Sequence, residues 1–285
     1  MSAVDHLEAG IYPIRGQAWE SREKNMADWL YHLPVVWMAV VVFAATFLVS
    51  AAIYAAVLAL ATGERARAFK AMSPVMLTPL AVVFGLIVAF LAAQVWSDVE
   101  RANNAVIREA NSLRTVVVLA ANFPQEQETR IRALVRSHIL EAVNEEWPAM
   151  ARHRARLSLI SASDAEGLQI ALSILPRNEA QTIAQRELVS SLQSARDARR
   201  QRIIISESTI NWVKWAVVDV LAVLILLTIA IVHSDNRATA AISMAVFSVA
   251  VAACIVLIAS HNRPFTGEIS VGPALLLEVL PGENP

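Results

Sequence analysis

The sequence predicts an all-α membrane protein, with four transmembrane helices in two hairpins and a helical-bundle cytoplasmic domain between helices 2 and 3. Four long apolar runs predict this fold, at residues 33–63, 72–97, 215–232 and 238–260. As a helix, each covers the hydrocarbon core of a bilayer, which takes about 20 residues. Hydrophobic residues make up 56 % of the chain, and the charged residues gather outside the runs.

The chain divides into five segments on this basis. Residues 1–32 form a polar amino-terminal segment, and residues 33–97 form the first transmembrane hairpin, with spans at 33–61 and 73–97. A helical bundle at residues 98–210 follows. The second hairpin covers residues 211–260, with spans at 212–233 and 238–260. Residues 261–285 form an extended tail, because Pro264, Gly267 and nearby β-branched residues disfavour a helix.

Four spans place the amino terminus, the bundle and the carboxyl terminus on one side of the membrane. More basic residues flank the spans on that side than lie in the two short turns, so the positive-inside rule favours the cytoplasm. Arg65, Arg67 and Lys70 oppose this prediction, because they crowd one short turn. We therefore expect a multi-pass protein of the cell (inner) membrane with its bundle and both termini in the cytoplasm.

The bundle is predicted to be helical throughout. The second span has no helix breaker before Pro124, so its helix should leave the membrane and project into water by roughly 35–40 Å. A second helix with an apolar stripe should run from residue 125 to 147 and end at Pro148. A short helix ends near Leu175, and a long one should run from Asn178 into the third span.

The second span has two unlike faces. One face carries small residues suited to close helix packing, namely Gly85, Ala89, Ala92 and Ala93. The opposite face carries Phe84, Ile87, Leu91 and Gln94. We predict that this second face lines a pore, because a ring of bulky apolar side chains can gate by dewetting. Contact of the same face with lipid is the alternative.

Two charged residues lie within or beside the third span. Lys214 stands between Trp212 and Trp215, which are typical of an interfacial belt, so its ammonium group can reach the surface or line a path. Asp219 lies deeper in the apolar run. It is a candidate cation site, proton relay or gate, because an ionised group in hydrocarbon is costly. The alternative is a shallow position paired with Lys214 or with an arginine of a neighbouring helix.

Other classes of function lack a sequence signal. We expect no enzyme activity and no cofactor, because HExxH, GxSxG, phosphate-loop and CxxC motifs are absent. His138, Glu141 and Glu145 have a spacing that could hold a divalent metal, but a solvated helix face is the preferred interpretation, and no metal site is predicted. A net charge of −1 without a basic stripe argues against a nucleic-acid partner.

A basic run precedes the third span and consists of Arg196, Arg199, Arg200 and Arg202. Contact with anionic headgroups is one interpretation, at about 1 kcal/mol per residue. The run could equally bind an acidic cluster of the bundle or draw anions toward a vestibule.

Five short sequence motifs provide further evidence. They are Ala89-Phe90 through Val95-Trp96, Arg108-Glu109-Ala110, Asn144-Glu145-Glu146-Trp147-Pro148, Arg199-Arg200-Gln201-Arg202 and Arg263-Pro264-Phe265-Thr266-Gly267-Glu268. Together, over roughly residues 75–280, they resemble the bestrophin-like family of bacterial and plant membrane proteins. The site residues that the resemblance implies are Glu109, Glu145, Glu146, Trp147, Arg199, Arg202, Arg263, Pro264, Phe265 and Gly267.

The resemblance implies a channel by analogy. True bestrophins, whose name the family borrows, have four spans per subunit and assemble as pentameric anion channels with the pore along the second span. We therefore expect a homo-oligomer in the lipid bilayer that conducts inorganic ions, chloride first, with a pentamer as the implied count. No acidic cluster matches a bestrophin calcium clasp. The alternatives are a membrane-anchored sensor or scaffold whose bundle binds a ligand or partner, and a proton-coupled transporter that uses Asp219.

Overall fold

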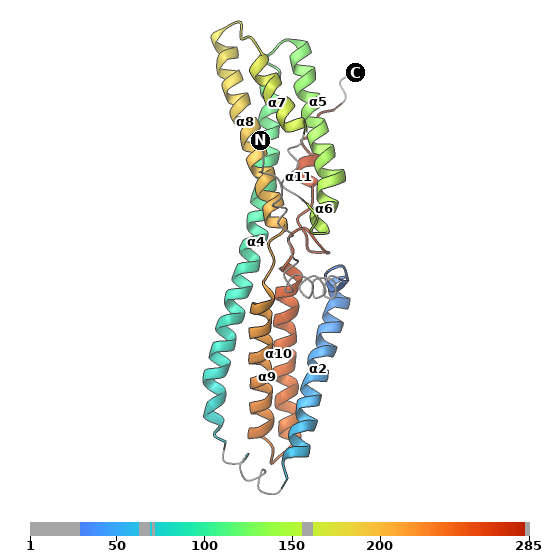
Figure 1. Ribbon diagram of the computed structural model, residues 1–285, viewed down its shortest axis with the longest axis vertical. Helices are drawn as coiled ribbons and strands as arrows, with labels where there is room; N and C mark the ends of the chain where they lie inside the picture. Colours follow the sequence, from blue (N-terminus) through green and yellow to red (C-terminus); the bar gives the residue numbers. More distant parts are fainter. Residues whose placement is uncertain (1–28, 63–68, 70–71, 156–161, 283–285) are drawn as a thin grey trace, which may run out of the picture.

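The computed structural model describes residues 29–62, 69, 72–155 and 162–282, with the backbone alone at 162–165. Most of the predicted amino-terminal segment lies outside the described residues, as do Arg65, Arg67 and Lys70 of the first turn. All regular structure in the described part of the chain is helical. The molecule is elongated, with a layer of membrane-length helices at one end and a bundle at the other (Figure 1).

Four helices form the membrane layer, and each is long and apolar enough to cross a bilayer. They are α2 (Val35–Leu60), the first part of α4 (Leu77–Ala120), α9 (Trp212–Val232) and α10 (Arg237–His261). A 3-10 turn, Pro74–Met76, precedes α4. The side chains of Asn211 and Asn236 accept backbone hydrogen bonds at the starts of α9 and α10 and so cap these helices. The four predicted spans begin and end within about one turn of these membrane segments, apart from the second, which continues as α4.

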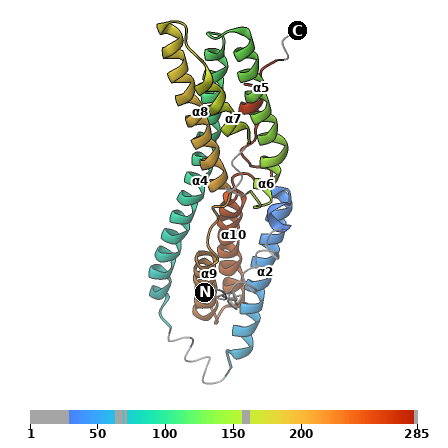
Figure 2. The same ribbon diagram turned by 45° about the horizontal axis from the view of Figure 1, so that its top comes forward.

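The membrane helices do not pack in the order of the sequence. α9 and α10 lie side by side, α2 packs chiefly on α10, and α4 packs chiefly on α9. α4 and α2 therefore lie at opposite edges of the layer, as Figures 1 and 2 show. The two helices of the first predicted hairpin are not a packed pair along their described lengths. Adjacency in sequence does not select a partner in lipid, because shape and small residues do.

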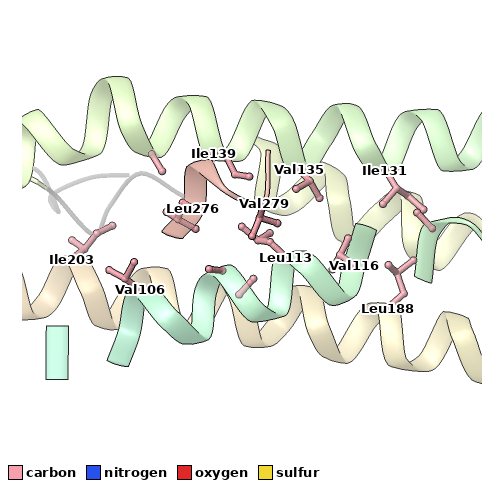
Figure 3. Close-up of a cluster of buried hydrophobic side chains, with 14 of the residues drawn as sticks. Val106, Leu113, Val116, Ile131, Val135, Ile139, Leu188, Ile203, Leu276 and Val279 are labelled. Carbon is pink, nitrogen blue, oxygen red and sulfur yellow. The ribbon is translucent and has the colours of Figure 1, made fainter. Parts of the chain in front are cut away.

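The bundle is built on the second half of α4, which leaves the membrane layer as predicted. α5 (Gln125–Glu141), α7 (Ala162–Ser173) and α8 (Glu179–Ser206) complete it. Its largest contact is the antiparallel pair of α4 and α8. Apolar side chains from α4, α5 and α8 fill the interior (Figure 3). Among them are Val106, Leu113, Val116, Ile131, Val135, Ile139, Leu188 and Ile203.

Pro148 does not end the second bundle helix, contrary to the prediction. After α5 the backbone widens into a π-helical turn, Ala142–Glu146, and then continues as α6 (Trp147–Ala151). Pro148 stands in the first turn of α6, directly after the widened π-helical turn, in which the Trp147 N–H donates to the Ala142 carbonyl five residues back.

The predicted continuous helix from Asn178 into the third span is also wrong. α8 ends at Ser206 and α9 begins at Trp212. In the gap, the Ile210 N–H donates to Asn262 Oδ1 at 2.9 Å, so this backbone group is satisfied outside a helix. The predicted extended tail contains one helical turn, α11 (Ala274–Leu277), and Leu276 of this turn is buried in the bundle core.

Candidate functional site

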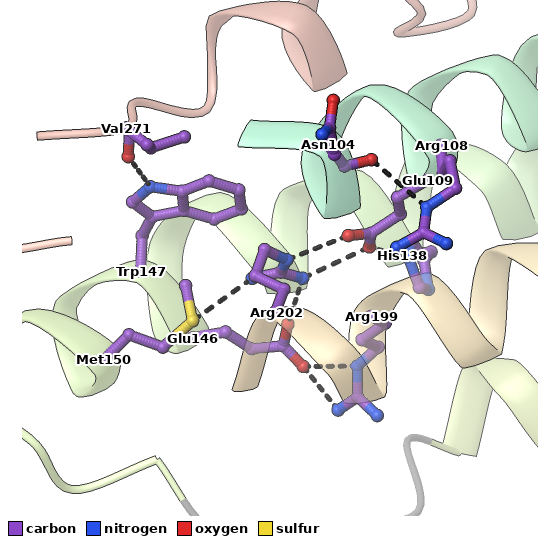
Figure 4. A network of polar contacts seen from close by, with 10 residues as sticks. All are labelled: Asn104, Arg108, Glu109, His138, Glu146, Trp147, Met150, Arg199, Arg202 and Val271. Atoms are coloured by element: carbon purple, nitrogen blue, oxygen red, sulfur yellow. Dashed lines mark hydrogen bonds and ion pairs between the residues drawn. The ribbon is translucent and has the colours of Figure 1, made fainter. Parts of the chain in front are cut away.

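A cluster of charged side chains is buried in the bundle, near the end of α8 that approaches the membrane layer (Figure 4). Its members are Glu109 of α4, His138 of α5, Glu146 of the π-helical turn, and Arg199 and Arg202 of α8. The antiparallel packing of α4 on α8 brings Glu109 and Arg202 together, although they are far apart in sequence.

Glu109 and Arg202 form the centre of this cluster, and the side chains of both are 0 % exposed. Arg202 Nε donates to Glu109 Oε2 at 2.8 Å, and Arg202 Nη2 donates to Glu109 Oε1 at 3.1 Å. This is the two-pronged geometry that a planar guanidinium favours with a carboxylate. His138 Nε2 lies 2.9 Å from Glu109 Oε1 and donates to it, because an ionised carboxylate only accepts.

The charges of the cluster support one another. Burial alone would raise the pKa of the Glu109 carboxyl, but the charge of Arg202 and the hydrogen bond from His138 outweigh it and lower this pKa from 4.5 to about 2. Burial likewise opposes the charge of Arg202, yet Glu109 and Glu146 raise the pKa of its guanidinium above its ordinary value. Both groups are therefore ionised at neutral pH.

Glu146 extends the cluster to a second arginine. Its Oε2 accepts from Arg202 Nη2 at 2.7 Å, and its Oε1 accepts from Arg199 Nε at 2.6 Å. Two carboxylates thus face two guanidiniums, and every carboxylate oxygen of the cluster accepts at least one hydrogen bond. With its acceptors occupied, the cluster acts as a joint between α4, α5, the π-helical turn and α8, because breaking a buried ion pair costs about 3–5 kcal/mol.

Trp147 links this cluster to the carboxyl-terminal segment. The Arg202 guanidinium carbon lies 4.3 Å from the centre of the indole ring, within the range of a cation–π contact. The Trp147 Nε1–H donates to the carbonyl of Val271 at 3.1 Å. The ring also meets Phe265 edge-on, with 6.0 Å between ring centres. The Arg263 to Glu268 motif is therefore held directly against the cluster.

The same motif reaches the membrane helices. Glu268 Oε2 accepts from the Val35 N–H, the first residue of α2, at 3.2 Å. Arg263 stacks on the ring of Tyr31 with its guanidinium carbon 4.1 Å from the ring centre. Gly267 has a φ of +89°, and a Cβ built there would lie 3.2 Å from the Tyr31 carbonyl oxygen. We call residues 262–271 the junction loop, because they connect the bundle with the starts of α2 and α9.

The structure brings most of the predicted motif residues together. Glu109, Glu146, Trp147, Arg199 and Arg202 form the cluster and its aromatic cover. Pro264, Phe265 and Gly267 lie in the junction loop, where the Pro264 carbonyl accepts from the Val271 N–H at 2.8 Å. Glu145 is the exception, because its side chain is exposed. Of the three interpretations of the basic run, binding an acidic cluster describes Arg199 and Arg202.

The predicted pore face of the second span is corrected. Phe84 and Leu91 are only 8 % and 4 % exposed and pack in a core with side chains of α9 and α10, and the Phe84 ring lies 5.9 Å from that of Phe247. Ile87 packs against the same core, and Gln94 Oε1 accepts from Lys214 Nζ of α9 at 2.6 Å. This face therefore packs largely on the subunit's own helices, which leaves little of Phe84 and Leu91 free to line a pore.

Lys214 and Asp219 are both exposed, but they differ in their contacts. Lys214 bonds to Gln94, so it ties α9 to α4 near the membrane boundary. Asp219 makes no hydrogen bond or ion pair among the described residues, and the predicted pairing with Lys214 is not present. The two residues lie five positions apart, which is about 140° around the helix. Asp219 therefore points away from α4.

His138 is the cluster member that sequence reasoning assigned to a different group. It bonds to Glu109, which lies 29 positions away on α4. No group of three or more potential metal ligands occurs among the described residues. Three further contacts were not predicted: Tyr31 lies under Arg263, Met150 contacts Arg202, and Asn262 bonds to Tyr31. The one sequence feature that could have identified His138 is its place in the apolar stripe of α5, which puts it on the inward face of that helix.

Comparison with known proteins identifies the family of the chain. A family model described as the bestrophin-like domain matches residues 44–276, a range that includes the charged cluster and most of the four membrane helices. No curated protein and no solved structure matches. The matched range also contains all five motifs of the resemblance. The chain belongs to the bestrophin-like family.

Proposed function

We propose that this protein is the subunit of an oligomeric channel that conducts anions along α4. The observation that carries the proposal is the course of α4, one unbroken helix that crosses the membrane layer and enters the bundle with one side uncovered throughout. Membership of the bestrophin-like family supports it by analogy, since true bestrophins are anion channels with the pore along the second span.

The uncovered side of α4 lies opposite the side that packs on α9 and α8. It carries Leu86, Ala89, Phe90 and Ala93 in the membrane, then Ser97, Asn104 and Asn111 beyond it, all of them exposed. Spacings of three, four and seven residues place these side chains on one helix face, which we call the open α4 face. The face changes from apolar to polar along its length, as the wall of an ion path that opens into water requires.

Small residues along one edge of this face allow a second copy of the chain to pack against that edge. A Cβ built at Gly85 would meet no atom within 4 Å, and Ala89 and Ala93 are also uncovered in the single subunit. In lipid, small side chains of this kind let two helices approach closely. A repeated head-to-tail contact closes a ring when its rotation allows. We propose such a ring, with a pentamer as the count implied by true bestrophins.

The aqueous half of α4 favours anions. Arg101, Arg108 and Arg114 are exposed along this half, and Arg101 is paired with Asp98. Glu100 is the one exposed carboxylate of this half in the described chain, so Arg108 and Arg114 outnumber it. Glu109 is neutralised inside the cluster. A path beside this helix therefore has an excess of positive charge, which raises the local concentration of anions.

Conductance in planar bilayers under a KCl gradient tests the proposal. We expect currents that reverse near the chloride potential. Ser97→Glu places a carboxylate where the open α4 face changes from apolar to polar and should move the reversal potential toward that of potassium, whereas Ser97→Gln adds similar bulk without charge and should not. Phe90→Ala removes an exposed ring from the same face and should raise the single-channel conductance.

Phe47→Ala is the matched control, because Phe47 is an exposed phenylalanine of α2, on the opposite edge of the layer. It should leave the conductance unchanged. Reversal near the potassium potential in the wild type would contradict anion selectivity. Equal effects of Phe90→Ala and Phe47→Ala would contradict a path along α4, and silence under all voltages would contradict a constitutive channel.

We further propose that the protein lies in the cell (inner) membrane with its bundle in the cytoplasm. Single cysteines at Ser190 and at Ser73, introduced into a Cys254→Ala background, test this orientation. Both serines are exposed, Ser190 on α8 of the bundle and Ser73 just before the 3-10 turn that precedes α4. An impermeant thiol reagent added to intact cells should label position 73 alone. Labelling at position 190 alone would place the bundle outside.

A sensor or scaffold is the second candidate, and the junction loop favours it. This loop connects the buried cluster to the starts of α2 and α9, so a partner bound to the bundle could alter the membrane helices through it. A subunit count in detergent separates the two functions. A closed ring of several subunits supports a channel, whereas a monomer or dimer supports the sensor.

A further inference from the structure

A cavity of about 70 Å³ lies inside the bundle, away from the membrane helices, and His138 of the charged cluster is one of its lining residues. Side chains from α4, α5, α7 and α8 line it, and its walls are mainly apolar, with Leu113, Val135, Leu168 and Leu192 among them. A water molecule needs about 10–15 Å³ measured in this way, so the cavity has room for about five groups of that size. It is therefore large enough for a short hydrocarbon chain.

Polar groups converge at one side of this cavity. Gln193 and Arg196 of α8 line it, and neither side chain makes a hydrogen bond or ion pair among the described residues. Gln193 is exposed and Arg196 is half-buried, so this side opens to solvent. None of the described lining residues is acidic. An apolar pocket with a few convergent polar groups is the usual form of a small-molecule site.

We propose that this cavity binds a small amphiphilic carboxylate, with its hydrocarbon chain among the leucines and its carboxylate on Arg196 and Gln193. The guanidinium of Arg196 can donate two parallel hydrogen bonds to a planar carboxylate, and Gln193 can supply a further amide donor. One arginine balances one negative charge. The available volume limits the chain to about four to six carbons.

The site is placed to communicate with the charged cluster. His138 lines the cavity, and its Nε2 donates to Glu109 in that cluster. A bound chain therefore contacts the residue that helps to fix α5 on α4. The inference goes beyond the proposed channel, and its test measures binding rather than current, so each can fail without the other.

Calorimetric titration of the full-length protein in lipid nanodiscs tests the site, with hexanoate as the probe. Acetate supplies the head alone and hexan-1-ol supplies the chain alone, so we expect both to bind more weakly than hexanoate. Arg196→Gln should weaken hexanoate binding about tenfold or more, because a hydrogen bond to a charged group is worth about 1.5–3 kcal/mol. Arg200→Gln is the control, because Arg200 lies one turn further on α8, is exposed and does not line the cavity.

Gly167→Ala tests the apolar part of the site without endangering the fold. The added methyl group would lie 3.7 Å from Leu192 Cδ2 and 3.9 Å from Leu134 Cδ1, which is ordinary contact, and alanine favours the helix. The variant should melt no earlier than the wild type, bind hexanoate more weakly and lose less affinity for butanoate. Equal affinity of hexanoate for the wild type and Arg196→Gln would overturn the proposal. So would equal affinity for hexanol, or no saturable binding by the wild type.

Discussion

The bundle buries charged groups together with their partners, whereas the membrane layer leaves charged groups exposed on the single subunit. In the bundle, Glu109 and Arg202 are completely buried, and each has several partners. In the membrane layer, Lys214 and Asp219 are exposed on the single subunit, and Asp219 makes no polar contact among the described residues. Water selects for burial of apolar surface, whereas lipid does not. An exposed apolar surface is thus ordinary in the layer, and the informative groups are the polar ones left uncovered.

The largest effect should come from breaking the bundle's buried charge pair. Glu109→Gln removes one carboxylate and leaves the Arg202 guanidinium buried beside only Glu146. We expect a loss of about 3–5 kcal/mol in the free energy of unfolding of the bundle, because an uncompensated buried charge is strongly destabilising. Thermal melting in nanodiscs, followed by circular dichroism, measures the change. Glu100→Gln alters an exposed carboxylate of the same helix and should change stability by less than about 0.5 kcal/mol.

The pH dependence of the same pair of proteins identifies the cause. The pKa of Glu109 is about 2 in the folded protein and 4.5 ordinarily, so the carboxylate stabilises the fold fully above pH 4.5. That contribution, about 3 kcal/mol, is lost as the pH falls from 4.5 through 2. The stability of the wild type should therefore converge on that of Glu109→Gln over this range. A constant difference between them at all pH values would show that side-chain packing, not charge, explains the loss.

The parts of the fold that the sequence predicted are those that a pattern in one segment determines. Long apolar runs specified the four spans, and the absence of a breaker before Pro124 specified the extension of α4. The predictions that failed depend on contacts between segments that are far apart in the sequence. The break between α8 and α9 depends on Asn262, which accepts a hydrogen bond from Ile210 across 52 positions. The partners of α2 and α4 depend on shape complementarity in lipid, which no local pattern records.

For the candidate site, the identity of the residues could be predicted from the sequence, whereas their geometry could not. The resemblance identified Glu109, Glu146, Trp147 and Arg202 as residues of interest, and the structure supplied their geometry. The two faces of the second span were recognised, but their orientation was reversed, because Phe84 and Leu91 pack on the subunit's own helices. In lipid, a bulky face and a small face can both make helix contacts, so composition alone does not decide which of them meets the same subunit.

An intermediate effect should come from the junction loop, where the two regions meet. Gly267→Ala forces a side chain onto a backbone with a φ of +89° and brings a Cβ to 3.2 Å from the Tyr31 carbonyl oxygen. We expect a loss of about 1–3 kcal/mol. Protease sensitivity of the segment before α2 should rise as well, because Tyr31 adjoins this loop. Gly85→Ala is the control, because it makes the same substitution within a helix. There alanine is favoured over glycine, so the free energy of unfolding of a single subunit should rise by up to about 1 kcal/mol. Equal melting of both variants would show that the loop carries no strain.

The smallest effect on ion flow should come from Asp219→Asn, although Asp219 is the most conspicuous charge in the membrane layer. Lys214 bonds to Gln94 of α4, and Asp219 lies about 140° further around α9, so it points away from the proposed path. Its carboxylate should then influence insertion rather than selectivity, since charge in hydrocarbon is costly and an amide carries none. The variant should insert at least as well as the wild type and keep its reversal potential. A shift of that potential toward chloride or potassium, with Ser97→Glu silent, would move the ion path from α4 to the outer side of α9.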